Sequence, residues 1–197
     1  MKKKLILSVD KLQCKRNNLT IFNFITFKAY EGSLVMVRGQ NGKGKTSFMH
    51  CLCGLIPYKG KIKWNIRSKY IGYVGHQVGL KDYETVEEFI LFWKKIYNSK
   101  LSLEKIVNYF SLEKLLYKPI AVLSFGQKKK LSFVRIVLTE SKIWLLDEPY
   151  SGMDTANQRL ITKIINTHLD DKGLVILSTH EKNNLFKQRN KQELIIV

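Results

Sequence analysis

Residues 39–46 combine three glycines with two lysines and a threonine at a spacing suited to binding phosphate. They read Gly39-Gln40-Asn41-Gly42-Lys43-Gly44-Lys45-Thr46, which fits the pattern G-x-x-x-x-G-K-[ST]. An apolar run precedes the loop and a helical segment follows it, so backbone N–H groups and a helix N-terminus would face one anion. Lys45 would reach the β- and γ-phosphates of a nucleotide, and the Thr46 hydroxyl would bind Mg²⁺. The alternative is a chance Gly-Lys-rich turn in a lysine-rich chain.

Two carboxylates, Asp147 and Glu148, follow an apolar run at residues 143–146. A buried strand has no need of acids, and ligands bind at the C-terminal edge of parallel sheets. We therefore expect Asp147 to hold Mg²⁺ and Glu148 to polarise the attacking water as a general base. The alternative is a pair of solvated loop acids before Pro149.

Residues 123–127 read Leu123-Ser124-Phe125-Gly126-Gln127 and resemble the LSGGQ signature of the ABC ATPases. Ser124 and Gln127 have the spacing of a capping box at a helix N-terminus, which favours anions. The resemblance implies that Ser124, Gly126 and Gln127 contact the γ-phosphate of ATP held by a second copy, so hydrolysis requires an ATP-dependent homodimer. Phe125 departs from the family pattern, because glycine is the commonest residue at that position.

The same resemblance assigns roles to three further residues. Gln77 matches the glutamine that senses Mg²⁺ and the attacking water. Asp154, in the segment 151–154, matches the loop that links the two subunits' sites. His180 matches the histidine that contacts the γ-phosphate. The other histidines are interpreted as satisfied core or surface residues: His50, His76 and His168.

The segment between the first strands lacks the aromatic residue on which the family usually stacks adenine. It reads Cys14-Lys15-Arg16-Asn17-Asn18. The planar guanidinium of Arg16 could stack on the base instead. Weaker selectivity for the base is the alternative.

The chain is strongly basic, with 34 Lys and Arg against 16 Asp and Glu and a formal net charge of +18. Such a surface favours polyanions, whether nucleic acid, anionic lipid or nucleotide phosphates. The alternative explanation of the positive charge is compositional bias, because Lys, Asn and Ile are enriched together and Pro is scarce, as AT-rich coding would produce. The run Lys128-Lys129-Lys130 after the signature is interpreted as a solvated helix face, with electrostatic help at the dimer interface as the alternative.

Hydrophobic periodicity places the elements that must position these residues. Strands are predicted at residues 5–9, 21–27, 34–38, 61–64, 71–74, 143–146 and 174–178, with a last extended segment at 194–197. Helices are predicted from near Lys45 to Gly54, within residues 86–97, 103–110 and 124–138, and at 157–169. This order indicates an α/β fold with a mostly parallel core sheet, N-terminal antiparallel strands and an inserted helical subdomain. The family resemblance makes it a P-loop NTPase of the ABC type, one domain over residues 1–197, with a RecA-like core at about 1–77 and 140–197 and a helical subdomain at about 78–139.

The cysteines and the hydropathy of the chain indicate in which kind of cellular compartment it works. Cys14, Cys51 and Cys53 form no spaced framework, which favours a reducing compartment, and we interpret Cys51 and Cys53 as small buried hydrophobes. No apolar run approaches the ~20 residues that cross a bilayer, so other chains would supply any membrane spans.

Residues 73–81 narrow the resemblance within the family. They read Tyr73-Val74-Gly75-His76-Gln77-Val78-Gly79-Leu80-Lys81. This segment, with residues 85–89, is similar to the G-H-Q-x-G-[LI]-K segment of cytochrome c biogenesis (haem exporter) ATPases. The resemblance implies a peripheral protein on the cytoplasmic face of a bacterial inner membrane, or on the matrix face of a mitochondrial one.

The partners implied are the integral membrane subunits of the exporter, with no stable nucleic acid partner. The apolar face of Val86, Phe89, Ile90 and Trp93 is expected to be core, and its exposed rim to receive a coupling helix. The alternatives are another small ABC transporter, or a soluble ABC ATPase that acts on nucleic acid or ribosomes, which the net charge favours.

Overall fold

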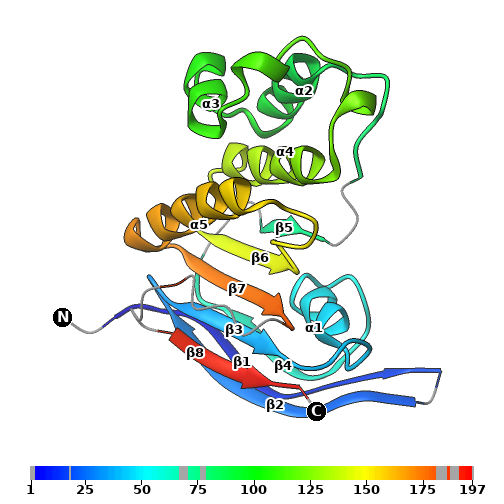
Figure 1. The fold of residues 1–197 in the computed structure, drawn as a ribbon. Coiled ribbons are helices and arrows are strands. Elements are labelled where there is room, and N and C mark those ends of the chain that lie inside the picture. Colours follow the sequence, from blue (N-terminus) through cyan, green and yellow to red (C-terminus); the bar gives the residue numbers. More distant parts are fainter. Residues whose placement is uncertain are drawn as a thin grey trace.

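Two β-sheets and five α-helices make up the part of the chain that the computed structural model describes, residues 3–17, 19–66, 71–75, 79–180, 186 and 191–196 (Figure 1). The larger sheet has the order β5-β6-β7-β3-β8, and every adjacent pair is parallel. Its strands are β3 (Leu34–Arg38), β5 (Gly72–Val74), β6 (Ile143–Asp147), β7 (Leu174–Thr179) and β8 (Lys191–Ile195). The expected parallel core is confirmed.

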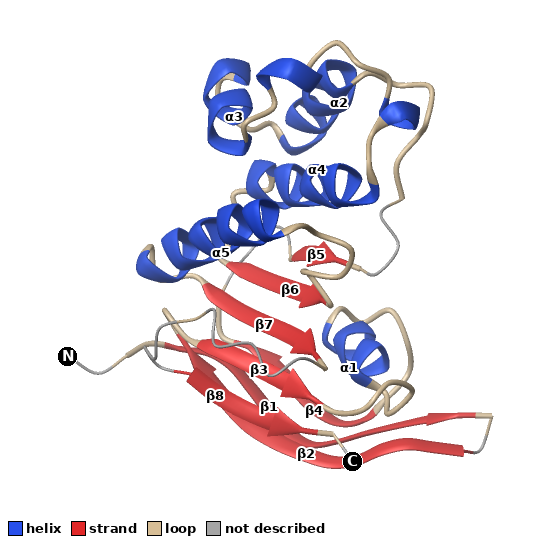
Figure 2. Ribbon diagram, viewed as in Figure 1, coloured by secondary structure: helices blue, strands red, loops and turns tan. Residues whose placement is uncertain are grey.

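Both faces of the central sheet are buried, which explains why its strands are continuous apolar runs. In β3, Leu34 and Met36 pack into one hydrophobic cluster while Val35 and Val37 pack into another. The first cluster joins the sheet to helices α2–α5, and the second joins it to α1 (Lys45–Leu52) and the smaller sheet. Figure 2 shows α2–α5 gathered above the central sheet and the smaller sheet below it.

The smaller sheet is antiparallel, with the order β2-β1-β4. It consists of β1 (Leu5–Arg16), β2 (Leu19–Tyr30) and β4 (Lys59–Trp64). β1 and β2 are longer than predicted, because backbone pairing continues past polar residues to Arg16↔Leu19 through several register shifts. The long hairpin carries Arg16 to the edge of the central sheet, where the phosphate-binding loop lies.

The helices agree closely with the predicted periodicity. They are α2 (Val86–Tyr97), α3 (Leu103–Phe110), α4 (Phe125–Leu138) and α5 (Thr155–Asp170), with short 3-10 turns at Glu113–Leu115 and Ile120–Val122. On α2, the expected core residues Val86, Phe89 and Ile90 are buried, and Trp93 packs partly buried against them. Among the described residues, every helix is too short or too polar to cross a bilayer.

The last strand differs from its prediction. β8 covers Lys191–Ile195 and not residues 194–197, because backbone pairing with β3 extends into a polar stretch. β8 lies at the edge of the sheet, where Glu193 pairs with Lys191 and Arg38 at 3.0 and 3.3 Å. Polar side chains are tolerated at an exposed sheet edge, so hydropathy alone misplaced the strand by about three residues.

The cysteines are free and sheltered from solvent. Cys14 and Cys51 are buried and Cys53 is half-buried. Burial raises the pKa of Cys51 to about 12 and the pKa of Cys53 to about 11. Both thiols therefore stay protonated, which fits their interpretation as small hydrophobic side chains.

His168 is a core residue, as expected. Its ring stacks on Trp144 with centroids 3.8 Å apart and an interplanar angle of 5°. A Cβ at Gly173 would lie 2.2 Å from the ring, so glycine leaves the space that the ring fills. Burial, with repulsion from Lys142, lowers the pKa of His168 to about 4.

This depressed pKa predicts a pH-dependent stability. The unfolded chain takes up the proton near pH 6.5 and the folded chain only near pH 4, so the free energy of unfolding is fully retained above pH 6.5 and falls as the pH drops between these values. The loss is up to about 3 kcal/mol. Urea unfolding of His168→Phe between pH 7 and 4.5 should show a weaker fall than the wild-type chain, whereas His50→Gln should follow the wild-type slope. Equal slopes for all three chains would contradict the assignment.

Candidate functional site

The loop at residues 39–46 joins β3 to α1 at the C-terminal edge of the central sheet (Figure 1). Gly44 caps the helix with φ 94°, a conformation that favours glycine. A Cβ at Gly44 would also lie 2.5 Å from Cγ2 of Ile21, on the β1–β2 hairpin. The loop thus curls tightly under the hairpin, in the strand–loop–helix setting that a phosphate-binding loop requires.

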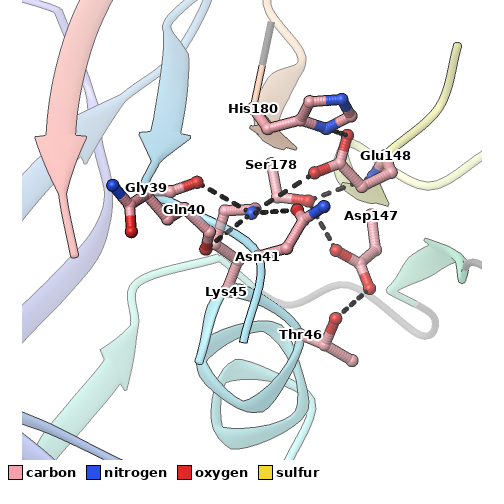
Figure 3. A network of polar contacts seen from close by, with 9 residues as sticks. All are labelled: Gly39, Gln40, Asn41, Lys45, Thr46, Asp147, Glu148, Ser178 and His180. Carbon is pink, nitrogen blue, oxygen red and sulfur yellow. Dashed lines mark hydrogen bonds and ion pairs between the residues drawn. The ribbon is translucent and has the colours of Figure 1, made fainter. Parts of the chain in front are cut away.

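The ammonium of Lys45 is held inside this loop, and the residue is only 6% exposed. Nζ donates hydrogen bonds to the carbonyl oxygens of Gly39 (2.9 Å) and Gln40 (3.2 Å) and to Oδ1 of Asn41 (3.4 Å), as Figure 3 shows. It lies 3.5 Å from Oε1 of Glu148. Most hydrogen-bond partners of this buried ammonium are neutral oxygens. Charged phosphate oxygens would replace them favourably, because charge-assisted hydrogen bonds are stronger.

Thr46 and Asp147 meet although they are 101 residues apart in sequence. The Thr46 hydroxyl donates to Oδ2 of Asp147 over 2.6 Å, and the Asp147 carboxylate is almost fully buried at the end of β6. A hydroxyl and a carboxylate oxygen are ligands that Mg²⁺ prefers. The residues present therefore fit a Mg²⁺ ion between the phosphate-binding loop and the end of β6.

Glu148 lines the same site in an unusual backbone conformation, with φ 47°. Non-glycine residues with positive φ are uncommon and cluster at functional sites. Its Oε2 lies 3.0 Å from Nδ1 of His180, and its backbone N–H donates to Oγ of Ser178 over 3.0 Å (Figure 3). These contacts hold Glu148 beside the ends of β6 and β7.

Ser178 is a functional residue that sequence reasoning missed. It is completely buried, and its hydroxyl donates to Oδ1 of Asp147 over 2.5 Å while accepting from the backbone of Glu148. The parallel pairing of β6 with β7 places Ser178 directly opposite Asp147. Local sequence does not reveal which strands are neighbours in a sheet. The only signal for Ser178 in the sequence is a hydroxyl in an otherwise apolar strand.

These residues surround one cleft of about 540 Å³, a size typical of small-ligand sites. Arg16 and Ile21 line it from the hairpin, together with the phosphate-binding loop, the β6 end and His180. Arg16 is therefore placed where a base extending from the phosphates would reach it.

Arg16→Ala should weaken ATP binding about two- to fivefold, the effect of losing one exposed cation–π contact. The rate at saturating ATP should stay near the wild-type value, because Arg16 contacts neither Asp147 nor Glu148. Equilibrium binding titrations with ATP would measure the loss, with Lys15→Ala, also exposed on β1, as the control for lost positive charge. Unchanged ATP affinity in Arg16→Ala would reject the stacking role.

The signature residues lie outside this cleft. Ser124, Gly126, Gln127 and Asp154 do not line it. Ser124 is exposed at the start of α4, and the expected capping box is confirmed: Gln127 N–H donates to Ser124 Oγ (3.2 Å), and Ser124 N–H donates to Gln127 Oε1 (2.9 Å). Asp154 caps α5 through the N–H of Asn157 at 2.7 Å. Their predicted contacts with a second copy's nucleotide remain predictions, and Gln77 and His76 lie outside the described residues.

The bulk of Phe125 is directed at the segment before α5. A Cβ on Gly152 would lie 2.3 Å from its ring, and Gly152 adopts φ 70°. Glycine at position 152 therefore makes room for the phenylalanine, and residue Phe125 stays 47% exposed.

The interpretation of Lys128-Lys129-Lys130 as a solvated face is wrong. Lys129 is fully buried and Lys130 is 5% exposed. α4 packs against α2 and α3 on one side, β5 on another and α5 beside it, so consecutive residues on it face different neighbours.

Known proteins resemble the chain along most of its length. The sequence profile described as ABC transporter matches residues 22–151. A cytochrome c biogenesis ATP-binding export protein of Histophilus somni is 32% identical over 202 residues, covering 94% of this chain and 93% of that protein. The export protein of the same description from Rickettsia conorii is 35% identical over 187 residues, covering 91% of this chain and 95% of that protein.

Solved structures show the same fold. A protein described as a metal-chelate type ABC transporter, in an inward-facing conformation, has a TM-score of 0.80 and 26% identity, covering 98% of this chain and 80% of that chain. An ABC transporter ATP-binding protein from Pyrococcus furiosus has a TM-score of 0.83 at 23% identity, covering 96% of both chains. The expected fold class is confirmed, while the boundaries of the helical subdomain at residues 78–139 stay a prediction.

Proposed function

Since the chain belongs to the ABC transporter family of ATP-hydrolysing proteins, we propose that it is the ATPase subunit of an exporter that serves cytochrome c biogenesis. Two relatives of that description match over at least nine tenths of the chain. The segment at residues 73–81 independently resembles that subgroup. ATP hydrolysis would power the membrane subunits, and the cargo is haem or a haem-related species.

The observation that supports hydrolysis is the convergence of Lys45, Thr46, Asp147, Glu148 and His180 on one cleft. Nucleotide binding alone requires only the loop and its lysine. A carboxylate held between His180 and Lys45 adds a base beside the phosphate-binding loop. The site therefore contains the parts of a phosphoryl-transfer centre.

In the proposed reaction, backbone N–H groups of the loop and the Lys45 ammonium bind the β- and γ-phosphates of ATP. Thr46 and Asp147 would hold Mg²⁺, which when bound neutralises charge on these phosphates. Glu148 accepts a proton from water as the water oxygen bonds to the γ-phosphorus and the bond to the β-γ bridging oxygen breaks, giving ADP and phosphate. His180 orients the Glu148 carboxylate through its 3.0 Å contact.

We propose that a second copy of the chain completes the site. Ser124 is exposed at a helix N-terminus, away from its own cleft, so a partner can reach its hydroxyl and the helix dipole. Two copies would close around two ATP molecules, with each Ser124 on the other copy's γ-phosphate. Closure and reopening would move the membrane subunits.

The contact with those subunits is proposed for α2. Leu91, Phe92 and Ile96 are about half exposed on this helix, beside its buried face. Exposed apolar groups of this kind mark protein contacts. Because the named relatives are bacterial proteins, we place the chain peripherally on the cytoplasmic face of a bacterial inner membrane; they give no support to the mitochondrial matrix.

Affinity purification from detergent-solubilised membranes tests this function. Co-purification with polytopic, haem-handling membrane proteins, abolished when Phe92 and Ile96 are changed to Glu, is the expected result. Retention of RNA or DNA that salt removes would instead support an ATPase acting on nucleic acid, the function that the net charge of +18 favours.

A further inference from the structure

Lys129 is a fully buried cation in the second turn of α4. Its Nζ donates a 2.7 Å hydrogen bond to the carbonyl oxygen of Gly75, the residue that follows β5. Burying an ammonium is costly unless its charge is compensated. The carbonyl oxygen of Gly75 supplies a hydrogen bond but no charge, so nearby carboxylates bear on the stability of this ammonium.

The central sheet brings the two hydrolytic carboxylates close to Lys129. β5 pairs with β6 so that Val74 lies opposite Leu146, which sets Gly75 level with Asp147. Burial lowers the pKa of Lys129 to about 8, and attraction to Asp147 and then to Glu148 opposes this lowering. The ammonium thus lies outside the cleft but is attracted to its two carboxylates, although its side chain comes from the helix that carries the signature.

The neighbouring lysines do not make this connection. Lys130 is almost as buried, but its Nζ donates to the carbonyl oxygen of Ser111 at the end of α3, over 3.3 Å. Lys128 is partly exposed and pairs with Asp82 over 2.8 Å. Of these three lysines, only Lys129 joins α4 to the edge of the central sheet.

One helix therefore touches two places of different function. Its first turn presents Ser124, which the proposed dimer places on the partner's nucleotide. Five residues later, Lys129 contacts Gly75, which follows β5 at the edge of the central sheet. Five residues of helix span about 7.5 Å, so the two ends move as one rigid piece. A change of charge at Asp147 and Glu148 alters the attraction on Lys129 and hence the preferred position of Ser124.

We propose that Lys129 is a positioning residue that couples the two ATP sites, by tying the helix that carries Ser124 to Gly75 at the end of β5, the strand that pairs with the one ending in Asp147. The inference rests on the proposed function, because it requires the homodimer. The inference predicts that ATP bound in a chain's own cleft changes how Ser124 of that chain contacts the ATP held by the second copy. Such coupling is a free energy between sites and is measurable as cooperativity.

The test uses the purified chain with three substitutions. Lys129→Met removes the charge and keeps the length, Lys129→Arg keeps the charge, and Lys130→Met is the matched control for a buried lysine on the same helix. Three quantities are measured: the Hill coefficient for ATP hydrolysis, ATP-dependent dimerisation by sedimentation, and ATP binding at protein concentrations where the chain is monomeric.

For two coupled sites the wild-type Hill coefficient is expected to approach about 2. Lys129→Met should bring it to about 1 and weaken ATP-dependent dimerisation about tenfold, while monomer ATP affinity changes less than about twofold. Lys129→Arg should restore cooperativity at least in part, and Lys130→Met should keep it. If Lys129→Met does not fold, Lys129→Gln, which keeps a donor for Gly75 without the charge, decides by the same criteria.

Two outcomes would overturn this inference and leave the proposed dimer intact. One is a wild-type Hill coefficient in folded Lys129→Met or Lys129→Gln, and the other is an equal loss of cooperativity in Lys130→Met, which would indicate general packing. A wild-type chain that hydrolyses ATP without cooperativity or ATP-dependent dimerisation would overturn both this inference and the proposed dimer.

Discussion

Glu148→Gln is expected to lower the turnover number for ATP by about 10³-fold, within the range that general-base catalysis contributes. Glutamine keeps the size of the side chain but cannot accept a proton from water. ATP binding should remain close to wild type, because phosphate contacts come from the loop and Lys45. Phosphate release and ATP binding, measured separately, distinguish these effects.

The same variant should accumulate an ATP-bound dimer, since hydrolysis is the step that reopens the two copies. Size-exclusion chromatography with ATP and Mg²⁺ would show it. Glu104→Gln, an exposed carboxylate on α3, is the control for the loss of one negative charge and should behave as wild type. Wild-type turnover in Glu148→Gln would show that Glu148 is not the base.

Lys45→Met should weaken ATP binding about 10²-fold. Each hydrogen bond between a charged group and phosphate contributes about 1.5–3 kcal/mol, and the buried ammonium is placed to make at least one with each of two phosphates. Turnover should become undetectable at ATP concentrations that saturate the wild-type chain. Isothermal titration with ATP gives the affinity directly.

The matched control for Lys45→Met is Lys61→Met, which removes an exposed positive charge from β4 without touching the loop. Because the net charge is +18, losing one surface charge should change ATP affinity only slightly. An equal loss of affinity in both variants would mean that overall charge, and not the position of Lys45, governs binding. ATP affinity retained in Lys45→Met would contradict its phosphate-binding role.

The site also explains why Asp147 and Glu148, adjacent in sequence, are expected to do different work. Asp147 accepts hydrogen bonds from Thr46 and Ser178 and is buried among them. Glu148, turned by its positive φ, contacts Lys45 and His180 on the side of the phosphates. Two like side chains thus acquire separate environments, which suit the metal-binding role proposed for Asp147 and the basic role proposed for Glu148.

Local sequence was sufficient for the parts of this protein that depend on short-range chemistry. The glycine spacing of residues 39–46 specifies a curled loop whatever surrounds it, and Ser124 with Gln127 specifies a helix start. Apolar periodicity located the helices, since one buried face repeats every three to four residues. The family resemblance rested on these same local motifs, and the profile match at residues 22–151 covers most of them.

Contacts between distant segments were decided only by the tertiary structure. Parallel pairing of β6 with β7 set Ser178 against Asp147, and the packing of α4 over β5 turned Lys129 from an expected surface charge into a buried link. The extension of β1 to Arg16 likewise depends on its partner strand. The physical reason is common to all three: a residue's own sequence neighbours fix its backbone preference, whereas strand order and helix packing determine which polar groups are buried together.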